Sequence, residues 1–453
     1  MPTQTSPTTL PSASQCEPDT GTSMTRRGFL AGSAGVAAAT TFTMGTRFAF
    51  ASPENPGSGD VLVLVFLHGG ADGLSLVAPF MMQSYRDLRP EIRVKDPGEF
   101  ADPVGKAGLP LVAGGNIGAF DESGTFAMHP GMQSLFDGAW TDGNLAVTHC
   151  VGMPSYESSS RSHFDSTKNW NVGSGDLNVS TGFLNRYLQG QAGVDRLAAV
   201  GRDSQLHKSL AGPVPAYSMT SIGSFNVSGF QNNTEAATTL DAWYDGAAPD
   251  LLLQTGANTL DTIGLVTGTD WDDPMFAVQN GATYPMHHFA HGLRETAMLI
   301  RANVGLRTVA IDYHGWDTHE GMGMPEDPDS WFRSKASILA DAMQAFYTDL
   351  GTMMDEVTLF SVSEFGRTIN QNGNEGTDHG RGSCALAMGR KVNGGVYGDF
   401  VDTIEDGPEG DLTVLNDYRR PISEILSVRG GATDLGAVFP TYSQEGALGL
   451  CQT

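Results

Sequence analysis

The stretch that decides the fold is residues 60–73, DVLVLVFLHGGADG. Residues 60–68 form a continuous run rich in valine and leucine, which predicts a strand buried on both faces, as in a parallel sheet. Glycines directly after such a strand allow a sharp turn and a close approach of the backbone to a ligand. We therefore expect polar groups, Asp72 among them, to gather at the carboxyl end of this strand.

Three further runs predict strands at residues 145–150 (LAVTHC), 307–312 (RTVAID) and 357–363 (VTLFSVS). Residues 292–304 and 329–350 carry apolar side chains at helical spacing, and residues 417–428 are expected to form a terminal helix. This alternation predicts an α/β fold with a mostly parallel central sheet and helices on both faces. Residues 52–453 are expected to form a single domain, with an irregular Ser/Thr/Asn/Gly-rich insertion around residues 203–273.

Composition limits the possible functions. The 453-residue chain carries 26 Lys and Arg against 51 Asp and Glu, a net charge of -25. Such a charge repels phosphate backbones and anionic lipids, so we expect no nucleic-acid partner and no electrostatic docking to membranes. Beyond the N-terminal segment, no apolar run approaches the roughly 18 residues of a membrane span, so stable membrane insertion is not expected.

The N-terminal segment predicts export. TRRGFL at residues 25–30 is a twin-arginine pattern, a weakly apolar stretch follows to about residue 44, and AFA at residues 49–51 is a cleavage pattern. We expect residues 1–51 to be a signal peptide, although an uncleaved amphipathic anchor is an alternative. The twin-arginine translocase would then be a partner during export, and the mature protein would be periplasmic or extracellular.

The cysteines leave two alternatives open. Cys16 would be lost with the signal peptide, which leaves Cys150, Cys384 and Cys451. One disulfide with one free thiol is possible outside the cytoplasm, and three buried free thiols are an equal alternative.

Five segments near predicted strand ends combine charged and nucleophilic groups: HGGAD (68–72), SSSRSHFD (158–165), HGWDTH (314–319), SEFGRT (363–368) and TDHGRG (377–382). Carboxylate oxygens and imidazole nitrogens together suit zinc, manganese and related divalent ions. The candidate metal ligands are Asp72, Asp317, His319, Glu364, Asp378 and His379. Alternatively, Asp72 and Asp317 could cap helices, and Asp378 could belong to a turn.

The catalytic candidates are Ser162, His163, Arg367 and Arg381. Ser162 is a possible nucleophile, His163 a base or ligand, and the arginines could clamp a tetrahedral anion. GxSxG, GxxxxGK[ST] and GxGxxG motifs are absent where a hydrolase or nucleotide site would need them. His287 and His291 could share a helix face, but no glutamate accompanies them, so a solvent face or a helix start is expected.

In their order along the chain, the arginine leader, VFLHGGADGLS (65–75), RSHFDS (161–166), GWDTHE (315–320), SEFGRT and TDHGRGS resemble a bacterial family called domain of unknown function 1501. That family is similar in fold to the alkaline phosphatase and sulfatase superfamily. The resemblance implies metal ligands at Asp72, Asp317, His319, Glu364 and His379 with Asp378, and a nucleophile at Ser162. Phe365 stands where the superfamily has a histidine, so one ligand of its two-metal site is missing.

The leading hypothesis is an exported metal-dependent hydrolase or transferase of phosphate or sulfate esters, with a small-molecule or polymer substrate. Its cofactor would be a divalent ion such as zinc, manganese or calcium. The alternative is a catalytically degenerate exported protein that binds a cell-surface polymer or a protein partner. A redox role is a weaker third possibility.

Overall fold

The structure, a computed structural model, describes residues 60–111, 125–176, 178–226, 238–240, 242, 244, 251–401 and 410–453. The expected signal peptide lies outside the described residues. Among the residues that are described, no helix combines the length and the apolar character needed to cross a membrane.

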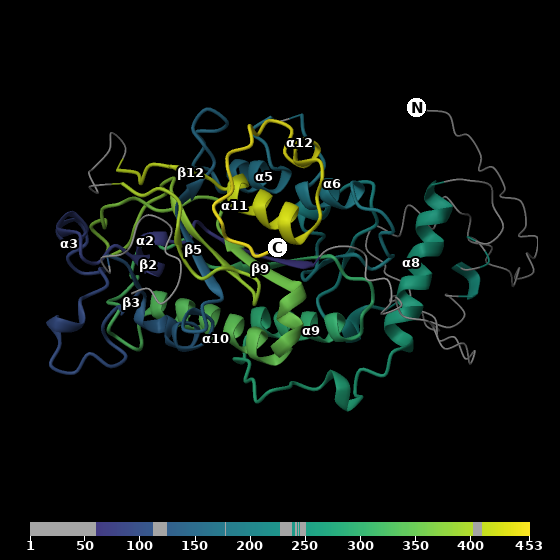
Figure 1. Cartoon of the computed structure of the whole chain (residues 1–453), viewed down its shortest axis with the longest axis horizontal. Coiled ribbons are helices and arrows are strands. Elements are labelled where there is room, and N and C mark those ends of the chain that lie inside the picture. Colours follow the sequence, from purple (N-terminus) through teal and green to yellow (C-terminus); the bar gives the residue numbers. More distant parts are fainter. Residues whose placement is uncertain are drawn as a thin grey trace, which may run out of the picture.

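A nine-stranded sheet forms the centre of the molecule, between two helical layers (Figure 1). Its strands lie in the order β11 (Gly395–Tyr397), β5 (Leu145–Gly152), β10 (Ser383–Met388), β9 (Val357–Val362), β1 (Val61–His68), β8 (Thr308–His314), β6 (Ala199–Gly201) and β7 (Tyr217–Ser218), with β12 (Asn416–Asp417) paired to β5. β1 is parallel to both of its neighbours, whereas β10 runs antiparallel to β5 and β9. The expected mixed α/β fold with a mostly parallel central sheet is confirmed.

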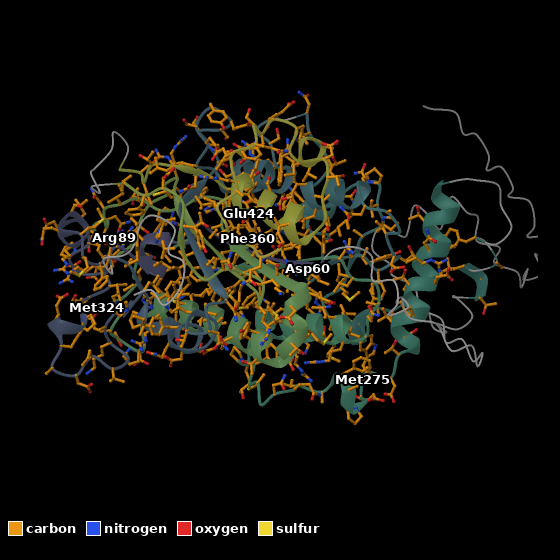
Figure 2. The ribbon with its side chains drawn as sticks, viewed as in Figure 1. Asp60, Arg89, Met275, Met324, Phe360 and Glu424 are labelled. Atoms are coloured by element: carbon orange, nitrogen blue, oxygen red, sulfur yellow. The ribbon has the colours of Figure 1, made fainter. Side chains whose placement is uncertain are left out.

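Alternate side chains of β1 enter two separate cores because successive residues of a strand point to opposite faces. Val63, Val65 and Leu67 pack in the core that α9 (His288–Arg301) and α10 (Trp331–Leu350) cover. Leu62, Leu64 and Phe66 pack in the core beneath α5 (His163–Val172), α6 (Phe183–Gln189), α11 (Arg419–Glu424) and α12 (Leu435–Val438). Phe360 of β9, labelled near the middle of Figure 2, belongs to this second core. Both faces of the sheet are therefore covered, as expected.

The two long helices follow the predicted spacing. α10 begins after Ser330, whose side chain caps the helix by accepting from the Arg333 N–H, and it ends before Gly351 at φ 55°. α9 begins four residues earlier than expected because the His287 side chain caps it by accepting from the Phe289 N–H. His287 therefore lies at a helix start, one of the two expected placements. We expected one helix over residues 417–428. The structure has the end of β12 at Asp417, then α11, and then a wider helical turn over Ile425–Arg429.

The remaining elements lie at the two ends of the sheet. A three-stranded sheet of β2 (Val77–Ala78), β4 (Ala127–Met128) and β3 (Leu109–Pro110) lies near the short helices α2 (Gly73–Leu76), α3 (Gln83–Leu88) and α4 (Gln133–Leu135). At the opposite end of Figure 1 lies α8 (Leu251–Gly268), an 18-residue helix within the segment that we expected to be irregular. Cys150 and Cys384 are buried, Cys451 is half-buried and all three are free thiols, which agrees with the second alternative for the cysteines.

Candidate metal centre

Three parallel strands, β9, β1 and β8, lie side by side, so the loops after them meet at one edge of the sheet. Glu364 follows β9, and Asp317 and His319 follow β8. His163 is the first residue of α5, and His379 lies in the loop before β10, where it bridges to Arg367 as in an antiparallel ladder. Five of the expected site residues are therefore brought together from four separate segments.

The centre of this cluster is one carboxylate oxygen, Asp317 Oδ1. The Nε2 atoms of His319 and His379 each lie 3.1 Å from it, and His163 Nε2 lies 3.4 Å from it. The Nε2 atoms of His319 and His379 are 3.0 Å apart. One ligand atom each from His163, Asp317 and His379 lie within 4.8 Å of one another, a spacing that could hold a metal ion.

The second nitrogen of each histidine is bound to an acceptor of the protein. His163 Nδ1 lies 2.8 Å from Glu364 Oε1, and His319 Nδ1 lies 2.8 Å from Asp378 Oδ1. His379 Nδ1 lies 2.8 Å from the carbonyl oxygen of Arg161. Carboxylates and carbonyls accept hydrogen bonds, so each Nδ1 carries a proton, and a ring that loses its second proton presents a lone pair at Nε2. This is the outer-shell pattern of metal-binding histidines.

The charges in the cluster are unequally stabilised. Burial opposes ionisation of Glu364, but hydrogen bonds from His163 and the Gly69 N–H keep its pKa below the ordinary value. The same hydrogen bond raises the pKa of His163, whereas burial lowers the pKa of His379. Despite partial burial, hydrogen bonds from Arg367 and His379 lower the pKa of Asp317 to about 2. Asp317 is therefore an anion across the physiological pH range.

Arg367 holds the loops of this cluster together and does not face solvent. Its side chain is buried and donates to Asp317 Oδ1 at 2.6 Å. Its other acceptors are the carbonyl oxygens of Gly69, Gly70, Trp316 and Thr377. A buried guanidinium with these partners is not exposed to a substrate, so Arg367 positions Asp317 and does not fit the expected role of anion clamp.

Asp72 is not part of the cluster. Its buried carboxylate forms an ion pair at 2.9 Å with Arg89, labelled in Figure 2, and accepts from the Ser75 N–H at the start of α2. Thr377 Oγ1 also lies 3.2 Å from it. These partners occupy the carboxylate, so Asp72 serves as the helix cap that was the alternative to a ligand. The expectation that Asp72 belongs to the ligand set does not agree with this geometry.

The other expected residues lie around the cluster. Ser162 is exposed at the start of α5, next to His163, and makes no capping hydrogen bond. Arg381 is partly buried, with its Nε 3.8 Å from Asp411, whose other carboxylate oxygen accepts from Arg161 at 3.0 Å. Glu364 and Asp378 hold histidines at Nδ1, so the structure gives them an orienting place and not that of direct ligands.

The cluster is open to solvent. The side chains of Asp317 and His319 are 48% and 44% exposed, whereas the orienting Glu364 is buried. A cavity of about 430 Å³ lies at the other end of the strands, where Val61 and Val357 begin β1 and β9. A ligand of this cluster would therefore bind at an accessible surface, away from that cavity.

The comparisons place the chain in a family. The family model described as Protein of unknown function (DUF1501) matches residues 60–414. The chain belongs to this family. The DUF1501 match includes every residue of the cluster and ends before α11 and α12. A comparison with curated proteins gives no match. The resemblance noted in the sequence is thereby confirmed at the level of the family.

The sequence-based interpretation did not assign a second group of polar residues, at the ends of β1 and β8. It contains His68, Asp312, His314 and His207. His68 and His314 lie in two segments that the sequence singled out, so their positions beside glycines were a usable signal. His207 carries no such signal, since it comes from a Ser/Thr/Asn/Gly-rich stretch.

Proposed function

We propose that the protein is an exported, metal-dependent hydrolase or transferase of phosphate or sulfate esters. The observation that carries the proposal is the convergence of three histidine Nε2 atoms on Asp317 Oδ1, with every Nδ1 bound to an acceptor. Nitrogens and a carboxylate oxygen that face one another at 3.0 to 3.4 Å need a positive charge among them, which protons or a metal ion supply.

The donor set fits a divalent metal ion. His163, His319 and His379 would supply imidazole nitrogens and Asp317 a carboxylate oxygen, held by Glu364, Asp378 and the Arg161 carbonyl. Nitrogen-rich sets of this kind favour zinc or manganese over calcium, which prefers oxygen. Such an ion, when bound, would polarise an ester oxygen and activate a nucleophile.

The residues around the cluster suit the remaining steps of ester cleavage. Attack by Ser162 Oγ would form a bond to phosphorus or sulfur and break the bond to the leaving alcohol, which takes up a proton. Water then releases phosphate or sulfate, or an acceptor alcohol takes the group in a transfer reaction. Arg381 is the arginine that we expect to face the anion, because Arg367 is already bound by the protein.

The fold is consistent with this proposal. In the alkaline phosphatase and sulfatase superfamily the metal ligands lie at the carboxyl ends of a central sheet. Here Asp317 and His319 follow β8, Glu364 follows β9, and His163 is the first residue of α5. The sandwich of that superfamily and the twin-arginine route of export remain part of the proposal. Residues 25–51 support export through their pattern alone.

A binding protein without catalysis is the second candidate. Phe164, next to His163, is 72% exposed and Tyr156 is 74% exposed. Phe164 adjoins the open polar cluster, and exposed aromatic rings suit adsorption to a cell-surface polymer or a protein partner. In that case metal could still bind, but ester cleavage would be absent.

The test uses the natively exported, folded protein. Metal content is measured by elemental mass spectrometry, and hydrolysis is measured with p-nitrophenyl phosphate and p-nitrophenyl sulfate. We expect bound transition metal and hydrolysis in the wild type, and loss of hydrolysis together with metal from the cluster in Asp317→Ala and His379→Ala. His291→Ala is the matched control, because His291 lies half-exposed on α9.

The outcomes separate the two candidates. A folded wild type without metal would overturn the metal-dependent proposal. Metal that is lost in both variants, without hydrolysis of either ester, would favour the binding protein.

A further inference from the structure

A second histidine cluster lies where β1 and β8 end. The register of the two strands pairs His68 with His314 and Phe66 with Asp312. His68 Nε2 lies 2.8 Å from Asp312 Oδ1, and the rings of His68 and His314 stack with their centroids 4.5 Å apart. One ligand atom each from His68, Asp312 and His314 lie within 4.8 Å of one another.

A fourth histidine points into the same cluster from another element. His207 precedes the short helix Lys208–Leu210, and its side chain is 4% exposed. Its Nε2 lies 3.2 Å from Asp312 Oδ1 but has no hydrogen-bond partner among the described residues. Buried polar atoms of folded proteins are nearly always bonded, so this nitrogen, close to Asp312 but outside good hydrogen-bond geometry, suits a ligand shared with that carboxylate.

Ser209 sets the orientation of His207. His207 Nδ1 lies 2.6 Å from Ser209 Oγ and 3.3 Å from the Ser209 nitrogen. Because the Ser209 N–H donates to Nδ1, that nitrogen is an acceptor, and the ring is held with Nε2 toward Asp312. An ion bound at Nε2 would take the place of the proton there. Ser209 thus fixes the direction of this ring through Nδ1, although it donates to that nitrogen where Glu364 and Asp378 accept from theirs.

We propose that His68, His207, Asp312 and His314 form a second binding site for a divalent transition-metal ion. Three imidazoles and one carboxylate are the donors that zinc and cobalt prefer, and the single negative charge leaves the loaded site with one net positive charge. Asp203 Oδ2 lies 3.8 Å from His314 Nε2 and could offset that charge.

This site is separate from the metal centre of the proposed function but adjoins it. None of its four residues belongs to the first donor set, and it has its own orienting residue, Ser209. The two sites meet at Gly69, whose N–H donates to Glu364 at 2.8 Å and which directly follows His68. The second site therefore goes beyond the proposed function and can be tested without an enzyme assay.

The test counts metal ions in the full-length exported protein. The protein is stripped with a chelator, dialysed and titrated with Co²⁺, and the bound equivalents are measured by calorimetry and by the visible absorption of the cobalt. We expect two equivalents in the wild type and one in Asp312→Asn or His314→Ala. His314 is 58% exposed, so its replacement should not disturb folding, which circular dichroism checks.

Variants of the first cluster make the outcomes distinguishable. His379→Ala should also bind one equivalent, and His314→Ala/His379→Ala none, whereas the His288→Ala control should bind two. A wild type with one equivalent that His314→Ala retains, or two equivalents that Asp312→Asn retains, would overturn the second site. One equivalent that is lost in His314→Ala but kept in His379→Ala would support the second site and contradict the first.

Discussion

The role of each histidine in the first cluster depends on what its Nδ1 atom contacts. In the first cluster, Glu364, Asp378 and a backbone carbonyl accept hydrogen bonds from the Nδ1 atoms. Glu364 and Asp378 therefore orient the histidines and do not face the metal position. Spacing along the sequence marks Glu364 and Asp378 as acidic neighbours of the site, but it cannot tell which nitrogen of a histidine they meet. Their assignment as ligands depended on that missing information.

We predict that Asp378→Asn weakens metal binding and does not abolish it. The amide can still contact His319 Nδ1, but it orients and polarises the ring less well than a carboxylate does. Loss of an outer-shell partner typically lowers metal affinity by about 10- to 100-fold. Competition with a chromogenic chelator measures the affinity, and Asp355→Asn, at an exposed pair with Arg390, is the control. An unchanged affinity would show that Asp378 does not orient His319.

A second prediction concerns Asp72. Its ion pair with Arg89 is fully buried, and removal of one partner leaves the other charge uncompensated. Asp72→Asn keeps a good helix cap, so the loss should come from the ion pair, and we expect about 3–5 kcal/mol less free energy of unfolding. Denaturant unfolding measures it, with Asp87→Asn on the exposed side of α3 as the control. The number of bound metal ions should not change; a lost equivalent would return Asp72 to the ligand set.

At the scale of elements, the predictable parts were the long, continuous apolar runs. β1, β5, β8 and β9 lie inside the sheet, and each contains a run of mainly apolar residues that is typical of a buried strand. β10 was missed because its small residues, SCALAM, follow a glycine-rich segment and carry little strand signal. The short strands β6, β7, β11 and β12 exist through pairing with distant neighbours, which a local pattern does not encode.

The turn after β1 links the fold to the candidate metal centre, and we predict that Gly69→Ala damages that centre. Gly69 has φ 119°, and a Cβ there would lie 2.5 Å from the Asp317 nitrogen. Such a contact with backbone must displace the Asp317 loop, so metal affinity should fall at least about 10-fold, in the range of second-shell defects.

Gly143→Ala is the matched control for this turn. Gly143 has φ 73°, but a Cβ there would meet nothing within 4 Å. It should cost about 1 kcal/mol of backbone strain and leave metal affinity unchanged. Equal effects of the two substitutions on affinity, measured by chelator competition, would mean that strain alone and not contact with Asp317 is responsible.

At the scale of the whole molecule, the candidate ligands tie together segments that are distant in the chain. The first cluster joins residues of α5, the loop after β8 and the loop before β10, and the second joins β1, β8 and the segment after β6. A metal ion at such a site binds the folded chain more tightly than the unfolded chain, because unfolding separates the ligands. Metal should therefore stabilise the entire fold and not one loop.

We accordingly predict that removal of metal lowers the free energy of unfolding. One ion at a free concentration of 100 times its dissociation constant stabilises a protein by about 2.7 kcal/mol, and two independent ions would add their effects. Urea unfolding with and without Zn²⁺ measures the difference. His314→Ala/His379→Ala should unfold at the same urea concentration in both conditions, and each single variant should retain part of the shift. An unfolding midpoint of the wild type that is the same with and without Zn²⁺ would contradict both sites. Among the described residues, only these two clusters bring three such ligands together.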